Sequence, residues 1–277
     1  MNSNYIGFTY DGKSLSEFSP NIIIGYMDKS DESFGLDREI VSGSTTMNRN
    51  IFHAYNTKYT DKLTFSITLL HADESRFSMG QISELTRWLT SPKSFRKLQF
   101  YDCEYHESEL IYFSIVTNVT PQKALGIAGL TLEFTCNSSY GYQQKTSGIL
   151  DTTNTLEVTN HTIAKTLVCD SDELEEYVYP TIAINADQLW SNIKIINHSD
   201  KDYVVDLYDL QGIYNINCQH QVVTKDGSHI MLCDLFKINE LKKLYWLRLL
   251  PGENELEIIG RCLVEITWLE PKKVGAF

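Results

Sequence analysis

Apolar and polar residues alternate along most of this chain, and a period of two predicts β-strands. In KLTFSITLLH (62–71), apolar side chains occupy every second position over most of the segment, as in a strand with one buried and one solvated face. GLTLEFTC (129–136) repeats the pattern. Further strands are predicted over residues 21–26, 96–102, 110–119, 181–186, 192–197, 202–208, 256–260 and 264–269. The sequence therefore predicts a mainly β protein.

One segment, SMGQISELTRWLT (78–90), has the period of an amphipathic helix. Ser78 and Gln81 have the spacing of a capping box, which marks a helix N-terminus. Pro92 ends the segment, because the residue before a proline disfavours the helical conformation. The apolar stripe consists of Ile82, Leu85, Trp88 and Leu89. We expect this stripe to pack on the first sheet.

The segment GFTYDGKS (7–14) matches the phosphate-loop pattern G-x-x-x-x-G-K-[ST]. That pattern works where a buried strand feeds a small loop at the start of a helix. Here Phe8 and Tyr10 are too bulky for a tight loop, and Asp11 places a negative charge where phosphates would lie. Pro20 stops any helix that begins near Ser14. We therefore expect no nucleotide site.

A β-hairpin accounts for the same residues. Asp11-Gly12 is a favoured two-residue type I′ turn, so YIGFTY and KSLSEF are predicted to pair as strands. In that register Tyr10 lies opposite Lys13, and Phe8 lies opposite Leu15.

The alternating pattern stops between residues 137 and 157, in NSSYGYQQKTSGILDTTNTLE. Small and polar residues without a strand period are typical of a domain linker. At 277 residues the chain is long enough for two domains. We predict a first domain over residues 1–140 that contains helix 78–90, a linker at 141–156, and a β-sandwich of the jelly-roll type over 157–277.

Composition excludes several classes of protein. Hydrophobic residues make up 42% and charged residues 22%, as in a globular protein. No apolar run approaches the roughly 20 residues of a membrane span, and the N-terminus has no signal-peptide pattern, so synthesis in a cytoplasm and no membrane insertion are expected. The net charge of −12, with basic residues scattered along the chain, disfavours sequence-specific binding to nucleic acid.

The cysteines do not form CxxC pairs, and several occupy apolar strand positions. Free cysteine behaves as a small buried hydrophobe, and a cytoplasm disfavours disulfides. Reduced thiols are therefore predicted for all six: Cys103, Cys136, Cys169, Cys218, Cys233 and Cys262.

Four residues have side chains typical of zinc ligands: Cys218, His220, His229 and Cys233. If Asp226-Gly227 is a two-residue turn, Thr224 pairs with His229 and His220 lies opposite Cys233. His229 then lies about 13 Å along the strand from Cys233, at about 3.3 Å per residue. Only three ligands remain, so no zinc site is expected.

Other catalytic patterns are missing or incomplete. The sequence has no GxSxG, and HESEL (106–110) has a leucine where a zincin helix needs its second histidine. DSDELEEY (170–177) lacks the glycine and the spaced oxygen ligands of an EF-hand loop, and a solvated surface segment is expected there. We predict no catalytic, cofactor-binding or metal-binding residues and no cofactor.

Several motifs, in their order, resemble the distal tail protein (Dit) family of long-tailed phages. The first is the opening hairpin FTYDGKSLSEF (8–18), and the second is a helix that ends in WL before KLQFYD (97–102). The strand GLTLEFTC then closes on NSSYGYQ, and LRLLPGENELEIIG (247–260) is similar to a late turn of the family. SGSTTMNRN (42–50) departs from the Pro-Gly-Arg-like turn of relatives.

This resemblance implies an N-terminal β-sandwich with a packed helix, followed by a galectin-like β-sandwich. It also implies a structural role without catalysis, in which N-terminal domains form a hexameric ring at the virion tail tip and DNA passes through the lumen. The implied partners are the tail tube protein, a tail-tip, tail-associated lysin or fibre hub protein, and receptor-binding proteins.

A carbohydrate-binding, lectin-like adhesion protein is the alternative function. Trp190, Trp246 and Trp268 are candidates for stacking on sugars, although aromatic residues on strands are more often part of the core. A glycosidase is a third possibility, because paired carboxylates can come from distant strands.

Overall fold

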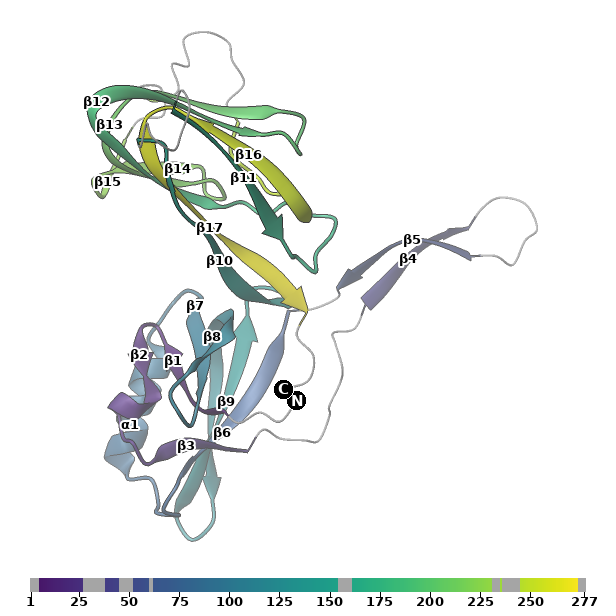
Figure 1. Ribbon diagram of the computed structural model, residues 1–277. Coiled ribbons are helices and arrows are strands. Elements are labelled where there is room, and N and C mark those ends of the chain that lie inside the picture. The colour runs from purple at the N-terminus through teal and green to yellow at the C-terminus, as the bar shows by residue number, and fades with distance from the viewer. Residues whose placement is uncertain are drawn as a thin grey trace. The chain divides into compact units, whose positions relative to one another are not determined.

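The computed structural model describes residues 5–26, 38–44, 52–59, 62–153, 161–230, 235 and 245–273 (Figure 1). In these ranges nearly all regular structure is β-strand, with one α-helix, and the predicted mainly β class is confirmed. The chain divides into two compact units. The first unit comprises residues 1–142 and 272–277, and the second unit comprises residues 143–271. Each unit has its own hydrophobic core.

The first unit contains most of the elements before residue 142. They are β1 (Tyr5–Tyr10), β2 (Lys13–Ser14), the 3-10 helix η1 (Leu15–Glu17), β3 (Ile22–Tyr26), β4 (Arg38–Ser44), β5 (Phe52–Tyr59), β6 (Thr64–His71), α1 (Met79–Thr90), β7 (Arg96–Asp102), β8 (Glu107–Lys123) and β9 (Ile127–Cys136).

The long strand β8 belongs to both layers of the first unit. Its first half pairs with β7, with Ser114 opposite Arg96, and its second half pairs with β9, with Val119 opposite Leu132. The register shifts between Val116 and Asn118, where an irregularity of this kind bends a strand. Two antiparallel layers result, β2-β1-β7-β8 and β3-β6-β9-β8.

Helix α1 packs on the first sheet, as the sequence predicts (Figure 1). Ser78 and Gln81 form the expected capping box, which satisfies amide groups that a helix start otherwise leaves without partners. Leu85 and Leu89 are buried, and the ring of Trp88 stacks on Phe8 at 5.9 Å between centroids. The core beneath the helix is rich in aromatic residues: Phe8, Tyr10, Phe100, Tyr112 and Phe134.

Strands β4 and β5 form a separate antiparallel ladder that no alternation in the sequence predicts. Its register places Arg38 opposite Tyr59 and Ser44 opposite Phe52. Residues 45–51, which include most of the segment that departs from the family turn, lie outside the described residues.

The second unit is a sandwich of strands from residue 143 onward. Its elements are the second part of β10 (Tyr140–Asp151), β11 (Thr162–Cys169), β12 (Thr181–Asn197), β13 (Tyr203–Asn217), β14 (Val222–Lys225), β15 (Ser228–His229), β16 (Gly252–Ile259) and most of β17 (Cys262–Lys273).

Strand β12 runs through both layers of the second unit. Its first part pairs with β17, with Ile182 opposite Ile266, and its last residues pair with β16, with Ile195 opposite Ile258. The sequence predicts two strands here, 181–186 and 192–197, but one continuous strand forms. The register with β13 shifts between Ala186 and Ile193. Long strands that change layers at an irregularity are how such sandwiches turn a corner.

The segment 141–156 is not the strand-free linker that its composition predicts. Most of it belongs to β10, which pairs with β17. Most side chains of β10 are exposed or half-buried, and Leu150 is the residue that enters the core of the second unit. Hydrogen bonds to a neighbouring strand hold β10 in place without burial of alternate side chains. The sequence therefore shows no alternation of apolar residues here.

The described helix is too short and too polar to cross a membrane.

Candidate functional site

The segment that matches the phosphate loop forms the predicted hairpin. Asp11 and Gly12 have positive φ angles of 51° and 77°, and Tyr10 lies opposite Lys13 as expected. The expected pairing of Phe8 with Leu15 is wrong, because β2 ends at Ser14 and η1 begins at Leu15.

The polar groups and the glycine of this segment have structural roles. The Ser14 hydroxyl accepts from the Ser16 amide, and the Ser14 amide donates to Glu17. A Cβ atom added to Gly7 would lie 2.3 Å from the Tyr101 ring. The Tyr101 ring therefore leaves no room for a side chain at position 7, which explains the glycine. The strand–loop–helix geometry that binds phosphate does not form.

The candidate zinc ligands are not brought together in the described part of the chain. Thr224 lies opposite His229, as expected. His220 precedes β14 in an exposed turn, where its amide donates to the Asn217 side chain, and Cys233 lies outside the described residues. Burial raises the pKa of the Cys218 thiol to about 12. No cluster of potential metal ligands occurs among the residues that the structure describes.

The acidic segment 170–177 belongs to the second unit and has no regular secondary structure. The Asp170 amide donates to the buried carboxylate of Glu270, which also accepts from the Trp268 indole at 2.9 Å. Glu175 and Glu176 are exposed, which confirms the solvated segment expected from the sequence. After this segment, Val178 pairs with Leu249 in an isolated antiparallel bridge.

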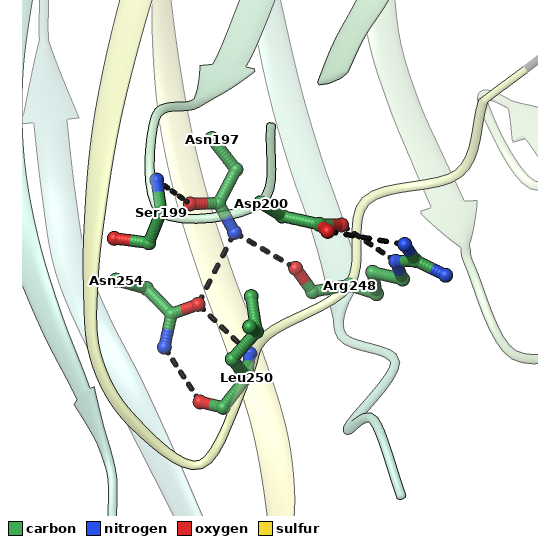
Figure 2. A network of polar contacts seen from close by, with 6 residues as sticks. All are labelled: Asn197, Ser199, Asp200, Arg248, Leu250 and Asn254. Carbon is green, nitrogen blue, oxygen red and sulfur yellow. Dashed lines mark hydrogen bonds and ion pairs between the residues drawn. The ribbon is translucent and has the colours of Figure 1, made fainter. Parts of the chain in front are cut away.

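The turn LLPGEN at residues 249–254 is closed by one buried asparagine (Figure 2). The Asn254 Oδ1 atom accepts from the Leu250 amide at 2.8 Å, and Nδ2 donates to the carbonyls of Leu250 (2.8 Å) and Gly252 (3.1 Å). Gly252 has a φ of 97°, which favours glycine. This is the turn that carries part of the family resemblance in the sequence.

A second asparagine joins this turn to the one between β12 and β13 (Figure 2). The Asn197 Nδ2 group donates to the Arg248 carbonyl at 3.0 Å and to Asn254 Oδ1 at 3.1 Å. Its Oδ1 atom accepts from the Ser199 amide. Two turns that lie far apart in sequence are thereby fixed to one another through buried amides.

The same turns present an ion pair. The Arg248 guanidinium donates to both carboxylate oxygens of Asp200, at 2.5 and 3.0 Å. Asp200 is almost fully buried, and a buried charge needs a partner of this kind. These hydrogen bonds raise the pKa of Arg248, which is charged at every physiological pH.

Tyrosines surround this arginine on the surface. The Arg248 guanidinium lies 3.9 Å from the Tyr177 ring centroid and 5.2 Å from that of Tyr203, which stacks on Tyr245. Tyr177 and Tyr179 remain 42% and 40% exposed. We call these five residues the tyrosine–arginine face. Tyrosine and arginine are the residue types that concentrate binding energy at interfaces.

A histidine beside the network bridges two carboxylates. His198 Nδ1 lies 2.6 Å from Asp202, and Nε2 lies 3.3 Å from Glu257. These contacts, with the hydrogen bond to Asp202 first, raise the pKa of the imidazole above its ordinary value.

The tryptophans proposed for sugar stacking are not an exposed set. Trp268 is buried in the core of the second unit, and Trp246 is half-buried against that core. The side chain of Trp190 lies outside the described residues.

Comparisons with known proteins point to a phage tail component. Residues 4–138 match a family described as the phage tail protein N-terminal domain. No curated protein matches the sequence. The Dit (gp 19.1) protein of phage SPP1, described as a paradigm of the hub adsorption apparatus in phages that infect Gram-positive bacteria, superposes with a TM-score of 0.61. It is 12% identical, and the match covers 96% of this chain and 99% of that one.

Two structures of the phage P2 baseplate in its activated conformation also match. The structure with Ca has a TM-score of 0.58 at 11% identity, covering 96% of this chain and 98% of that chain. The structure with Sr has a TM-score of 0.55 at 11% identity, covering 98% and 99%. These matches show that the chain has the Dit fold over both units. The resemblance to the distal tail protein family is confirmed in the fold, and the match of residues 4–138 supports a structural protein of a phage tail.

Proposed function

We propose that this chain is the hub protein of a phage tail tip, which assembles as a hexameric ring and joins the tail tube to the tip and adhesion device. One observation carries the proposal: the Dit fold extends over 96% of the chain. The match of residues 4–138 to a phage tail domain supports it independently. The proposal assigns no reaction to the chain, because the proteins that it resembles are described as parts of an adsorption apparatus and a baseplate.

The first unit is the part that we assign to the ring, and residues before about 140 form most of it. A closed ring needs one interface between two different surfaces, repeated around an axis. The second unit then faces outward, where its turns can hold other tip or receptor-binding proteins. Since the chain has 36 acidic and 24 basic residues, a lumen lined by it does not retain DNA by phosphate contacts.

Imaging of the purified full-length chain by negative stain tests the proposal. We expect rings of sixfold symmetry, alone at high concentration or with the tail tube protein of the same phage. Particles that stay monomeric in both conditions contradict the proposal. Fragments that follow the units, 1–142 and 143–271, place the interface, and ring formation by the second fragment alone contradicts the assignment to the first unit.

Carbohydrate binding is a second candidate function, and the tyrosine–arginine face is the observation that favours it. Exposed aromatic rings next to a guanidinium and a carboxylate offer both stacking and hydrogen bonds to a sugar. A glycan array with the full chain and with Tyr177→Ala tests this function. Tyr105, another exposed tyrosine, is in the first unit, and Tyr105→Ala is the control. Absence of any glycan signal, or a signal that Tyr177→Ala leaves unchanged, rejects this site.

A further inference from the structure

The turn between β12 and β13 carries a histidine that contacts carboxylates on two different elements. His198 Nδ1 lies 2.6 Å from Asp202 in the same turn, and Nε2 lies 3.3 Å from Glu257 on β16. An ionised carboxylate only accepts hydrogen bonds, so both ring nitrogens have to donate. Only the imidazolium cation has an N–H group on each nitrogen. The two contacts therefore form together only when His198 is protonated.

The neutral ring can keep one of the two contacts, because it has a single N–H group. The contact with Asp202 is the shorter one and lies within the turn, so we expect it to persist. The other ring nitrogen then presents a lone pair to Glu257, and the carboxylate is repelled. Deprotonation should therefore remove this side-chain contact between the turn and β16.

The turn has an unfavourable backbone that depends on contacts with β16. Lys201 and Asp202 have φ angles of 56° and 54°, and a lysine is strained in the left-handed region. Residues in such conformations persist where surrounding contacts hold them. The His198 amide donates to the Glu255 carbonyl at 2.9 Å, and the Ser199 hydroxyl accepts from the Glu255 amide at 3.0 Å. Loss of a further contact to the same strand should loosen this turn.

The same turn supports the tyrosine–arginine face. Asp200 lies at the centre of the turn and accepts two hydrogen bonds from the Arg248 guanidinium (Figure 2). That guanidinium lies over the Tyr177 ring. The positions of these side chains thus depend on the conformation of residues 198–202.

We propose that His198 is a pH-sensitive bridge between the β12–β13 turn and β16, closed in acid and open in alkali. The inference goes beyond the proposed ring and requires no ligand on the tyrosine–arginine face. The open bridge leaves the turn freer to move, and Asp200 and Arg248 move with it. A ligand of that face would therefore bind more weakly in alkali.

Other charged side chains lie on the turn and on the segments beside it. They are Lys165 on β11, Lys194 on β12, Asp200 and Lys201 in the turn, Asp206 on β13, Arg248, and Glu253 and Glu255 on β16. Within the described residues, His198 forms ion pairs with Asp202 and Glu257 and with none of these. The hydrogen bond to Asp202, and then that to Glu257, raise the pKa of His198 above its ordinary value of 6.5. The bridge is therefore complete below that value and is lost as pH rises through the higher folded value.

Hydrogen exchange of the full-length chain, from about pH 5 to about pH 9, tests the inference. Protection is corrected for the pH dependence of intrinsic exchange. Peptides that contain residues 198–203 should lose protection by about two- to fivefold as the pH rises, which is the range of one exposed ion pair. The midpoint of this loss should lie above 6.5.

Two variants assign the loss of protection to the bridge. His198→Gln should abolish the pH dependence, because glutamine does not titrate in this range. Glu257→Gln should also abolish it, because an amide can accept from the cation and donate to the neutral ring. Glu255→Gln, on the same strand, and His106→Gln, an exposed histidine beside two carboxylates in the first unit, are the matched controls. Both controls should retain the pH dependence.

Three outcomes overturn the inference. The first is constant protection of residues 198–203 in the unmodified chain, and the second is a pH dependence that His198→Gln retains. The third is a pH dependence that Glu257→Gln leaves unchanged, which means that β16 is not the partner. Ring assembly does not enter this measurement, so failure of the bridge and failure of the hub function are recognised separately.

Discussion

Replacement of Asn254 by alanine should destabilise the second unit specifically. The side chain of Asn254 is completely buried and makes four hydrogen bonds, to the amide and carbonyl of Leu250, the carbonyl of Gly252 and the amide of Asn197. Alanine removes all four and leaves their partners to find water. Because a turn and a neighbouring turn both depend on this residue, the effect should extend beyond its own loop.

The magnitude follows from which partners water can reach. A buried polar group without a partner costs about 1–3 kcal/mol. Asn197 keeps its hydrogen bond to Arg248, and Gly252 is exposed, so these groups contribute least. The Leu250 amide and carbonyl carry most of the loss, and we expect about 3 kcal/mol in total. For a unit of this size, that lowers the melting temperature by roughly 10 °C.

Scanning calorimetry and hydrogen exchange measure this effect and its location. Peptides of the second unit should exchange faster in Asn254→Ala, and peptides of the first unit should not change. Asn254→Asp keeps the acceptor for the Leu250 amide but puts an oxygen against two carbonyls, so it should cost at least as much. Exposed Asn215 on β13 gives a control, Asn215→Ala, within about 0.5 kcal/mol. A loss below about 0.5 kcal/mol in Asn254→Ala refutes the reasoning.

Three further predictions concern single residues. Gly7→Ala should lower the stability of the first unit by about 2 kcal/mol, because its Cβ would overlap the Tyr101 ring; urea unfolding measures this, and an unchanged midpoint contradicts it. The raised pKa of His198 means that its contribution to stability is complete below its ordinary value of 6.5 and is lost as pH rises through the higher folded value. Unfolding of the chain and of His198→Gln should therefore differ at pH 5 to 6 and converge in alkali, and a constant difference contradicts this. Exposed Cys103 should react with a thiol reagent well before Cys136, whose burial raises its pKa to about 12; equal rates in the folded chain contradict this.

Local signals in the sequence are sufficient to predict several elements in both units. The capping box at Ser78 and the helix of 79–90 form as predicted, since both depend on residues within a few positions of each other. The turns at Asp11-Gly12 and Asp226-Gly227 also form, because positive φ angles at both residues follow from the turn type. Where local chemistry decides the structure, the sequence predicts it.

Strand β10 could not be predicted in this way. Its residues are mainly polar and either exposed or half-buried, and its hydrogen bonds come from pairing with strands far away in sequence. Propensity is a weak guide in such a case, because tertiary pairing determines the structure.

The candidate site likewise has one part that local sequence predicts and another part that depends on residues far apart in the sequence. The motif around Gly252 and Asn254 is visible as a turn signal, but its partner Asn197 lies 57 residues earlier. No spacing connects Asp200 to Arg248 either, and Tyr177 comes from a third segment. A network built from three turns appears only when the sandwich brings those turns to one end of the unit.

Ring formation by the full-length chain tests the central claim most directly. Class averages of negatively stained particles, collected with the protein alone and with the tail tube protein, should show a closed ring of sixfold symmetry. Class averages that show only monomers in both samples contradict the tail-tip hub function, whatever the second unit binds.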